Sequence, residues 1–359
     1  MPLRRIYPPP SVDGDDEDNA VIDIIAVHGL NPKNKKKEAH ALDTWRAPPG
    51  KDGKLWLRDA LPKKIKDARI FLYVYDSAVV YSKDQRTFVD KANGLLEDIC
   101  AEREDREDRP LLLLGHSLGG LLIKQALINA HNNEEYASVK KAVKGLVFFG
   151  TPHSGYNDDK GLLVTVGQVA ANTAQSLGFN KHGDKIVEVL ERDSLFSDLM
   201  HEHWRHRLLE FPIVSFWGSQ DTIVPKASAT FGLPGKNEKI ISLDADHSGV
   251  CKFGDTQTDQ DNYKLVQRQI VELYKQAISR SCSINDNSKS TGLHHVHGME
   301  PQVRQGYLLH HLPGVVSGQA LMFAVQNPSA GPQVTFLPPS VVTLPARHNP
   351  LARDPAQSD

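Results

Sequence analysis

The stretch that decides the fold is residues 111–130, LLLLGHSLGGLLIKQALINA. Its four leucines form an apolar run of strand length, and the part from Leu118 to Ala130 has the composition of a buried helix. Between them, six residues satisfy the pattern G-x-S-x-G: Gly115-His116-Ser117-Leu118-Gly119-Gly120. Such a serine lies on a strained strand-to-helix turn, where flanking glycines let the backbones approach closely. The pattern predicts an exposed, nucleophilic Ser117 hydroxyl; the alternative is a glycine-rich turn with an incidental serine.

Segments on both sides of this stretch repeat the alternation of strand and helix. Aliphatic and β-branched residues predict six buried strands: Val21 to Val27, Ile70 to Val74, Leu111 to Gly115, Val143 to Gly150, Ile213 to Trp217 and Lys239 to Leu243. Longer amphipathic stretches predict helices between them: Trp56 to Ile65, Gln85 to Asp105, Leu118 to Ala130, a helical pair within 160–202, and Asp261 to Ser279. Such alternation requires crossover connections, so we expect an α/β fold with a mostly parallel sheet and helices on both faces.

The composition excludes several classes of protein. The chain has 359 residues, 42 Lys and Arg against 44 Asp and Glu, and a net charge of −2. Near-neutral charge argues against a nucleic-acid binder, which needs a clustered basic face. No apolar run reaches the roughly 18 residues of a membrane span, and the N-terminus leads into prolines and acidic residues rather than a secretory signal. Three cysteines without paired spacing favour a reducing compartment, so we expect an intracellular, cytoplasmic protein.

Changes in composition along the chain predict its domain boundaries. Residues 1–20 contain prolines and an acidic run, and we expect a disordered lead there. Residues 21–280 carry the strands and helices of one domain. Within it, the connection at about 156–211 is longer than an ordinary crossover and predicts an inserted helical cap, with plain core packing as the alternative. Residues 281–359 are rich in proline and poor in charge, and predict an irregular, disordered tail.

A nucleophilic serine needs a histidine base, and the base needs an acid that orients it. His247 follows the last predicted strand and Asp221 follows the strand before it, so both come at the carboxyl ends of strands. The chain order serine, acid, histidine is the one expected for this kind of sheet. We therefore predict Ser117, Asp221 and His247 as catalytic residues. A surface histidine and a loop-capping aspartate are the alternatives, and Asp244 and Asp246 are rival acids close to His247.

The oxyanion of such a reaction needs backbone N–H donors. The sequence predicts one from Leu118, directly after the serine, and a second from Leu30 in the loop after the first predicted strand. His28-Gly29 at that place lets the backbone turn over the site, although an ordinary strand-ending turn explains it too. Because His116 shares the turn of the serine, its side chain is expected to point away from Ser117. The residues predicted to line the pocket are His28, Gly29, His116 and His153.

Two further features carry weaker signals. Lys33, Lys35, Lys36 and Lys37 form a basic loop beside the predicted site, which favours a solvated loop but also suits an anionic lipid head group. In the tail, His294-His295-x-His297 is too crowded to converge on one ion, so no metal is expected. No phosphate-binding loop or dinucleotide fingerprint is present. We therefore expect no cofactor.

Several motifs together resemble those of the serine-active-site-containing family of serine esterases and lipases in the α/β-hydrolase superfamily. They include AVHGLN at 26–31, GHSLGG at 115–120, FFGTPHSG at 148–155 and DHSGVCKF at 246–253. The resemblance is greatest to the fungal branch, in which such a domain precedes the NB-ARC or NACHT ATPase of NLR-type receptors. It covers about residues 20–280, and implies Ser117 as nucleophile, His247 as base and Leu30 and Leu118 as oxyanion donors. It also allows peripheral association with mitochondrial or endoplasmic reticulum membranes.

Two hypotheses for function follow. The first is a serine esterase or lipase that cleaves an acyl ester, such as that of a lipid, through an acyl-enzyme on Ser117. The second is a signalling or interaction module that uses the same fold with little or no catalysis, because a fold does not determine function. An acyl ester or lipid is the expected substrate, and nucleic acid is not expected as a partner. The acyl chain, the leaving group, the protein partners and the oligomeric state are not determined by the residues.

Overall fold

The structure is a computed structural model that describes residues 3–9, 19–31, 36–77, 85–154, 156–157, 163–164, 204 and 207–290. A seven-stranded sheet runs through it in the order β1-β5-β2-β6-β7-β10-β11. Its members are β1 (Leu3–Tyr7), β2 (Ile22–Val27), β5 (Ala68–Tyr73), β6 (Leu111–His116), β7 (Val143–Phe149), β10 (Ile213–Gly218) and β11 (Glu238–Leu243). All neighbours pair in parallel except β1, which is antiparallel to β5. The six predicted strands are therefore confirmed.

The first strand corrects the predicted disordered lead. Residues 3–7 form β1, whose Leu3 and Ile6 are 7% and 8% exposed. These two apolar side chains contribute to the hydrophobic clusters on the two faces of the sheet, so the edge strand is held by burial as well as by pairing. The acidic run at 13–18 lies outside the described residues.

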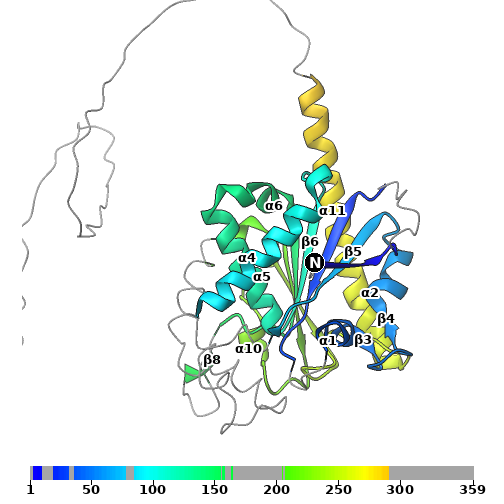
Figure 1. Cartoon of the computed structure of the whole chain (residues 1–359). Coiled ribbons are helices and arrows are strands. Elements are labelled where there is room, and N and C mark those ends of the chain that lie inside the picture. Colours follow the sequence, from blue (N-terminus) through cyan, green and yellow to red (C-terminus); the bar gives the residue numbers. More distant parts are fainter. Residues whose placement is uncertain are drawn as a thin grey trace, which may run out of the picture. The chain divides into compact units, whose positions relative to one another are not determined.

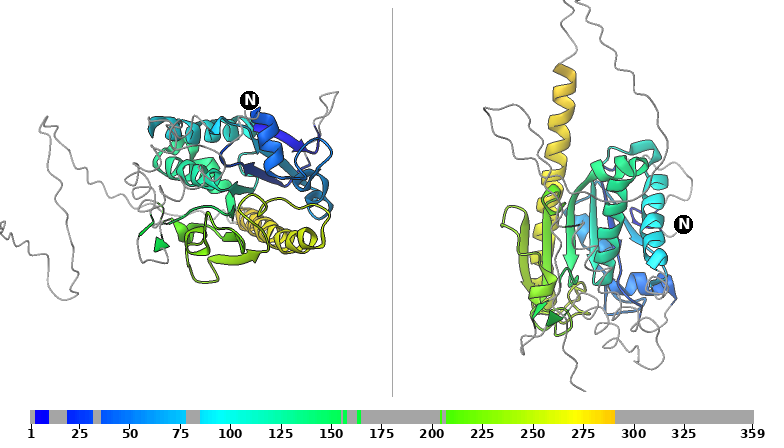
Figure 2. Two further views of the ribbon diagram at one scale, coloured as in Figure 1. Left: turned by 90° about the horizontal axis from the view of Figure 1, so that it is seen from below. Right: turned by 90° about the vertical axis from the view of Figure 1, so that its left-hand side faces the viewer.

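Helices cover both faces of the sheet, as predicted (Figure 1). On one face lie α4 (Gln85–Glu102) and α5 (Leu118–Asn132); on the other lie α2 (Trp56–Asp59) and α11 (Gln257–Ser290). Figure 2 shows the cyan helices and yellow α11 on opposite sides of the strands. Side chains of a strand alternate between faces, so Leu113 packs under α4 and α5 whereas Leu112 and Leu114 pack toward α11.

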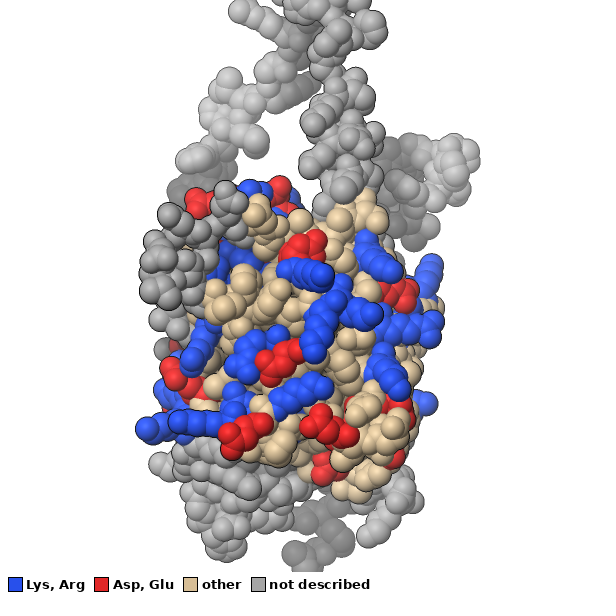
Figure 3. Space-filling view, turned by 90° about the vertical axis from the view of Figure 1, so that its right-hand side faces the viewer, with Lys and Arg blue, Asp and Glu red and all other residues tan. Residues whose placement is uncertain are grey.

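The remaining elements are short. They are α1 (Lys37–Thr44), α6 (Ala137–Ala142), α10 (Lys226–Ala229), the antiparallel pair β3 (Arg46–Ala47) and β4 (Lys54–Leu55), and the 3₁₀ turns η1 (Leu61–Lys63), η2 (Glu104–Arg106), η3 (Glu134–Tyr136) and η4 (Leu208–Glu210). The helices predicted at Trp56 to Ile65 and at Gln85 to Asp105 each divide into an α-helix and a 3₁₀ turn. On the face shown in Figure 3, acidic side chains are interspersed among more numerous basic ones.

Two boundaries differ from the prediction. Helix α11 continues to Ser290, so the first residues of the predicted irregular tail are helical; no glycine or proline interrupts the chain between Gln257 and Ser290. In the predicted helical cap, β8 (Tyr156–Asn157) pairs antiparallel with β9 (Leu163–Val164), where a helix was predicted. A two-strand pair satisfies its backbone groups locally without helical periodicity. The remaining cap residues, apart from 204 and 207–211, and the tail after 290 lie outside the described residues.

Candidate active site

The carboxyl ends of the parallel strands meet at one edge of the sheet, and Ser117 lies there between β6 and α5. Its φ of 53° is the only positive φ of a non-glycine residue in the described chain. This left-handed conformation is strained for a residue with a Cβ. The turn is compact, because a Cβ on Gly115 would lie 2.6 Å from the Cα of Gly120. The glycines on either side of the serine therefore allow the strand and helix to approach as the sequence pattern predicted.

The side chains of Ser117, His247 and Asp221 are connected in series. Nε2 of His247 lies 2.9 Å from Oγ of Ser117, and Nδ1 lies 2.8 Å from Oδ2 of Asp221. A carboxylate accepts, so Nδ1 carries the proton, and Nε2 is left to accept the serine hydroxyl proton. The other oxygen of Asp221 accepts the backbone N–H groups of Ile223 and Val224, at 2.9 and 2.8 Å. These bonds hold the carboxylate in place against the histidine ring.

The two rival acids have other partners. The carboxylate of Asp244 accepts hydrogen bonds from Nε2 of Gln220 at 2.6 Å and from Oγ of Ser219 at 3.3 Å. Asp246 accepts the backbone N–H of Gly249 at 2.6 Å. The structure therefore brings Asp221, rather than Asp244 or Asp246, to the ring of His247.

The loop after β2 lies directly against the serine. A Cβ on Gly29 would be 2.9 Å from the Cβ of Ser117, and one on Gly119 would be 2.3 Å from the carbonyl oxygen of His28. Leu30 and Leu118 are both buried, and Leu118 is the first residue of α5, where helical N–H groups have no intrahelical acceptor. The structure thus places Leu118 directly after the serine and brings Gly29, the residue before Leu30, against it. The role of Leu30 and Leu118 as oxyanion donors stays a prediction.

The predicted pocket-lining histidines occupy different surroundings. His28 is buried, stacks on Tyr75 with ring centroids 4.4 Å apart, and has its pKa lowered to about 3 by burial. His153 is also buried and stacks on Phe231 at 3.8 Å. His116 places Nε2 3.0 Å from the carbonyl oxygen of His247. A pocket-lining role for these side chains stays a prediction.

Sequence reasoning missed two side chains that contact the loop, Tyr75 and His40. The Tyr75 hydroxyl donates to the carbonyl oxygen of His28. Nε2 of His40 lies 3.3 Å from the carbonyl oxygen of Gly29. Tyr75 comes two residues after β5, the neighbour of β2 in the sheet. Its place just past the carboxyl end of a parallel strand was the signal available in the sequence.

Several other predicted features lie partly or wholly outside the described residues. Lys33 and Lys35 are outside the described residues, whereas Lys37 forms an ion pair with Asp76 at 3.2 Å. No described helix is both long and apolar enough to cross a membrane. The described ranges also contain no group of three or more metal-binding side chains, and His294, His295 and His297 lie beyond them. Intracellular location and membrane contact stay predictions.

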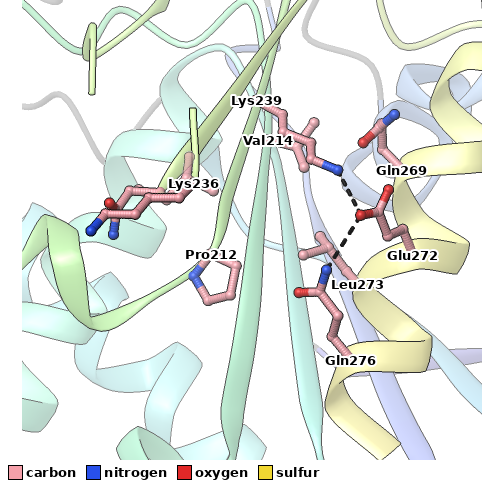
Figure 4. Close-up of a pocket in the computed structure, with 10 residues that line it drawn as sticks. Pro212, Val214, Lys236, Lys239, Gln269, Glu272, Leu273 and Gln276 are labelled. Carbon is pink, nitrogen blue, oxygen red and sulfur yellow. Dashed lines mark hydrogen bonds and ion pairs between the residues drawn. The ribbon is translucent and has the colours of Figure 1, made fainter. Parts of the chain in front are cut away.

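A polar groove lies elsewhere, beside the amino end of β10 and against α11 (Figure 4). In it, Nζ of Lys239 pairs with Glu272 at 2.7 Å, and Gln276 also donates to Glu272 at 3.4 Å. Ser117 follows the carboxyl end of β6, a parallel strand of the same sheet, so the groove is at the opposite edge from the serine.

The strand order, the parallel pairing and the strained Ser117 between β6 and α5 define the chain as an α/β-hydrolase-fold protein. No family model matches it. Among curated proteins, it is similar to Protein SERAC1 of Danio rerio, at 28% identity over 156 residues, which cover 40% of this chain and 21% of the relative. It is also similar to human Protein SERAC1, at 25% identity over 259 residues, covering 64% of this chain and 36% of the relative. The chain therefore spans about a third or less of the length of these relatives.

Solved structures of low identity also align with the chain. An α/β hydrolase from a marine lagoon sediment metagenome, MGS-MChE2, aligns at 16% identity and a TM-score of 0.38, covering 71% of this chain and 92% of that one. The lipase BlEst2 of Bacillus licheniformis aligns at 15% identity and a TM-score of 0.41. The alignment covers 70% of this chain and 92% of the lipase. The predicted resemblance to the fungal receptor branch gains no support from the SERAC1 relatives, which are vertebrate proteins.

Proposed function

We propose that the protein is a serine hydrolase that cleaves an acyl ester, with Ser117 as nucleophile, His247 as base and Asp221 as orienting acid. The observation that carries the proposal is the connected series from Ser117 Oγ to His247 Nε2, at 2.9 Å, and from His247 Nδ1 to Asp221, at 2.8 Å. Both distances are hydrogen-bond distances, as a nucleophile and its base require.

In the proposed acylation step, Oγ of Ser117 bonds to the carbonyl carbon of the ester while its proton moves to Nε2 of His247. The carbonyl oxygen becomes an oxyanion and accepts the N–H groups of Leu118 and Leu30. When the tetrahedral species collapses, the bond to the alcohol oxygen breaks and His247 gives the proton to that oxygen. The alcohol leaves, and the acyl group stays on Ser117.

In the proposed deacylation step, water adds to the acyl carbon and gives a proton to Nε2 of His247. Collapse breaks the bond to Oγ, and His247 returns the proton to Ser117, which releases the acid. Asp221 keeps the proton of the neutral ring on Nδ1 and stabilises the imidazolium that forms in each step.

The test uses a fluorophosphonate probe and a series of p-nitrophenyl esters of increasing acyl length. Wild type is expected to be labelled and to hydrolyse at least one ester. Ser117→Ala should lose labelling and more than about 10⁴-fold in kcat. Ser154→Ala is the matched control, because Ser154 also follows a strand of this sheet but its hydroxyl contacts the carbonyl of Ala227. Equal labelling of wild type and Ser117→Ala, or hydrolysis that survives the substitution, would overturn the proposal.

A further inference from the structure

Side chains donate hydrogen bonds to two consecutive backbone carbonyl oxygens in the loop after β2, those of His28 and Gly29. The Tyr75 hydroxyl donates to the carbonyl oxygen of His28 at 2.7 Å. The carbonyl oxygen of Gly29 lies 2.8 Å from Nδ1 of His28 and 3.3 Å from Nε2 of His40. A carbonyl oxygen only accepts, so both of these ring nitrogens carry protons. Three donors therefore converge on two consecutive peptide groups.

Burial keeps two of these donors, His28 and Tyr75, in the required protonation states at neutral pH. The pKa of His28 is lowered to about 3, so its ring is neutral and has a single N–H, which the contact with Gly29 places on Nδ1. Burial also raises the pKa of Tyr75, so its hydroxyl keeps its proton. The ring of His28 is held between two others, stacked on Tyr75 and edge-on to His40 at 4.8 Å. The loop cannot turn without disrupting this packing.

The orientation of one peptide carbonyl determines the orientation of the next N–H. The peptide bond between Gly29 and Leu30 is trans, because the cis bonds of the described chain precede Pro8 and Pro48. In a planar trans peptide the C=O and N–H point in opposite directions. The N–H of Leu30 therefore points away from His28 and His40. In the same loop, Gly29 packs closely against Ser117: a Cβ added to Gly29 would lie 2.9 Å from the Cβ of Ser117.

We propose that Tyr75 and His40 are positioning residues, which hold the peptide groups of His28 and Gly29 so that the Leu30 N–H is aimed in advance at the oxyanion formed on Ser117. This inference rests on the proposed hydrolase function. Donors oriented before the reaction stabilise the transition state without reorganisation. A Gly29–Leu30 peptide that turned over would present a carbonyl oxygen to the oxyanion and repel it.

The test compares Tyr75→Phe with Tyr73→Phe. Each substitution removes one hydroxyl that donates to a backbone carbonyl and leaves the aromatic ring, but the Tyr73 hydroxyl contacts Lys91 in α4, at 3.1 Å, rather than the loop. Tyr75→Phe is expected to lower kcat about tenfold or more, and to leave KM within about twofold of the wild-type value. Loss of an entire oxyanion donor lowers kcat by a factor of about 10²–10³. Tyr73→Phe should stay within about twofold of wild type.

A second pair of variants tests His40, which is only partly buried. His40→Phe should lower kcat in the same way, whereas His40→Gln, which keeps an N–H donor, should restore most of it. A trifluoromethyl ketone, whose carbonyl takes up Ser117 as a tetrahedral oxyanion, supplies the second readout. Its inhibition constant should rise in proportion to the loss of kcat/KM across the variants.

Two outcomes would overturn the inference. One is that Tyr75→Phe and Tyr73→Phe lose the same activity while His40→Phe loses none. The other is that kcat falls but the inhibition constant of the ketone does not change. Failure of the proposed function is a separate result: wild type then shows no hydrolysis that depends on Ser117, and all variants are equally inactive.

Discussion

Nε2 of His116 lies 3.0 Å from the carbonyl oxygen of His247, so the residue before the serine holds the backbone of the base. Burial lowers the pKa of His116 well below its usual value, which leaves the ring neutral, and its N–H donates to the carbonyl. The strand-to-helix turn at 115–120 thus positions two groups at once, the hydroxyl of Ser117 and the loop that carries His247.

We predict that His116→Leu lowers kcat by about tenfold to a hundredfold, because a small displacement of the base weakens the proton transfer. His116→Gln keeps an N–H donor and should retain most of the activity. Steady-state hydrolysis of a p-nitrophenyl ester measures both variants. If the Leu and Gln variants have the same kcat, the hydrogen bond to His247 has no role in catalysis.

The choice of Asp221 over its neighbours gives a second prediction. Asp221→Asn preserves the shape of the side chain but not the acceptor that holds Nδ1–H, and kcat should fall by roughly 10³–10⁴. Asp244→Asn is the matched control, since Asp244 contacts Gln220 rather than the histidine ring and this variant should stay within about twofold of wild type. A large loss in the Asp244 variant and none in the Asp221 variant would reverse the assignment of the acid.

Lys124 predicts a dependence of stability on pH. Its ammonium lies over the rings of Trp204 and Phe231, 5.9 and 5.4 Å from their centroids, and burial lowers its pKa to about 7. The unfolded chain binds this proton up to the ordinary lysine pKa of about 10.4, so the free energy of unfolding should rise as pH rises from 7 toward 10. The destabilisation is complete below pH 7 and amounts to several kcal/mol.

Urea denaturation at pH 7.5 and 9.5 tests this dependence. Lys124→Met removes the charge at similar volume, and it should be more stable than wild type at pH 7.5 by a margin that shrinks at pH 9.5. Lys275→Met, at an exposed position of α11, should show no such change. A margin that is the same at both pH values would contradict the prediction.

A buried ion network at the amino ends of β2 and β5 gives a prediction on stability. The carboxylate of Asp23 accepts the guanidinium groups of Arg69 at 2.8 Å, Arg103 at 2.5 Å and Arg109 at 3.3 Å, and all four side chains are buried. Asp23→Asn leaves the guanidinium groups without this counter-charge and should lower the free energy of unfolding by about 3–5 kcal/mol.

The matched control is Glu272→Gln, which breaks the exposed pair with Lys239 and should cost about 1 kcal/mol or less. Urea denaturation measures both variants. If both variants lose the same small free energy of unfolding, the Asp23 network contributes no more to stability than a surface pair does.

The local sequence pattern determined the central strand of the sheet, the turn after it and the helix that follows. The apolar run and the glycines at 111–120 predicted β6, the turn and α5, because strand length, close backbone approach and helix composition are all properties of neighbouring residues. Asp221 and His247 were found by the same reasoning, since parallel strands bring their carboxyl ends to one edge. Strand β1 was missed because its few apolar residues, Leu3 and Ile6, gain a partner only when β5 is already in place.

Tertiary structure alone decided which side chains meet. Asp221, Asp244 and Asp246 are equivalent as residue types near a histidine, and only the path of the loop after β10 brings the first to Nδ1 of His247. Tyr75 and His40 likewise contact residues 28 and 29 across distances in sequence that no local pattern records. A hydrogen bond depends on tenths of an ångström and on direction, and these are set by the packing of the whole sheet and its helices.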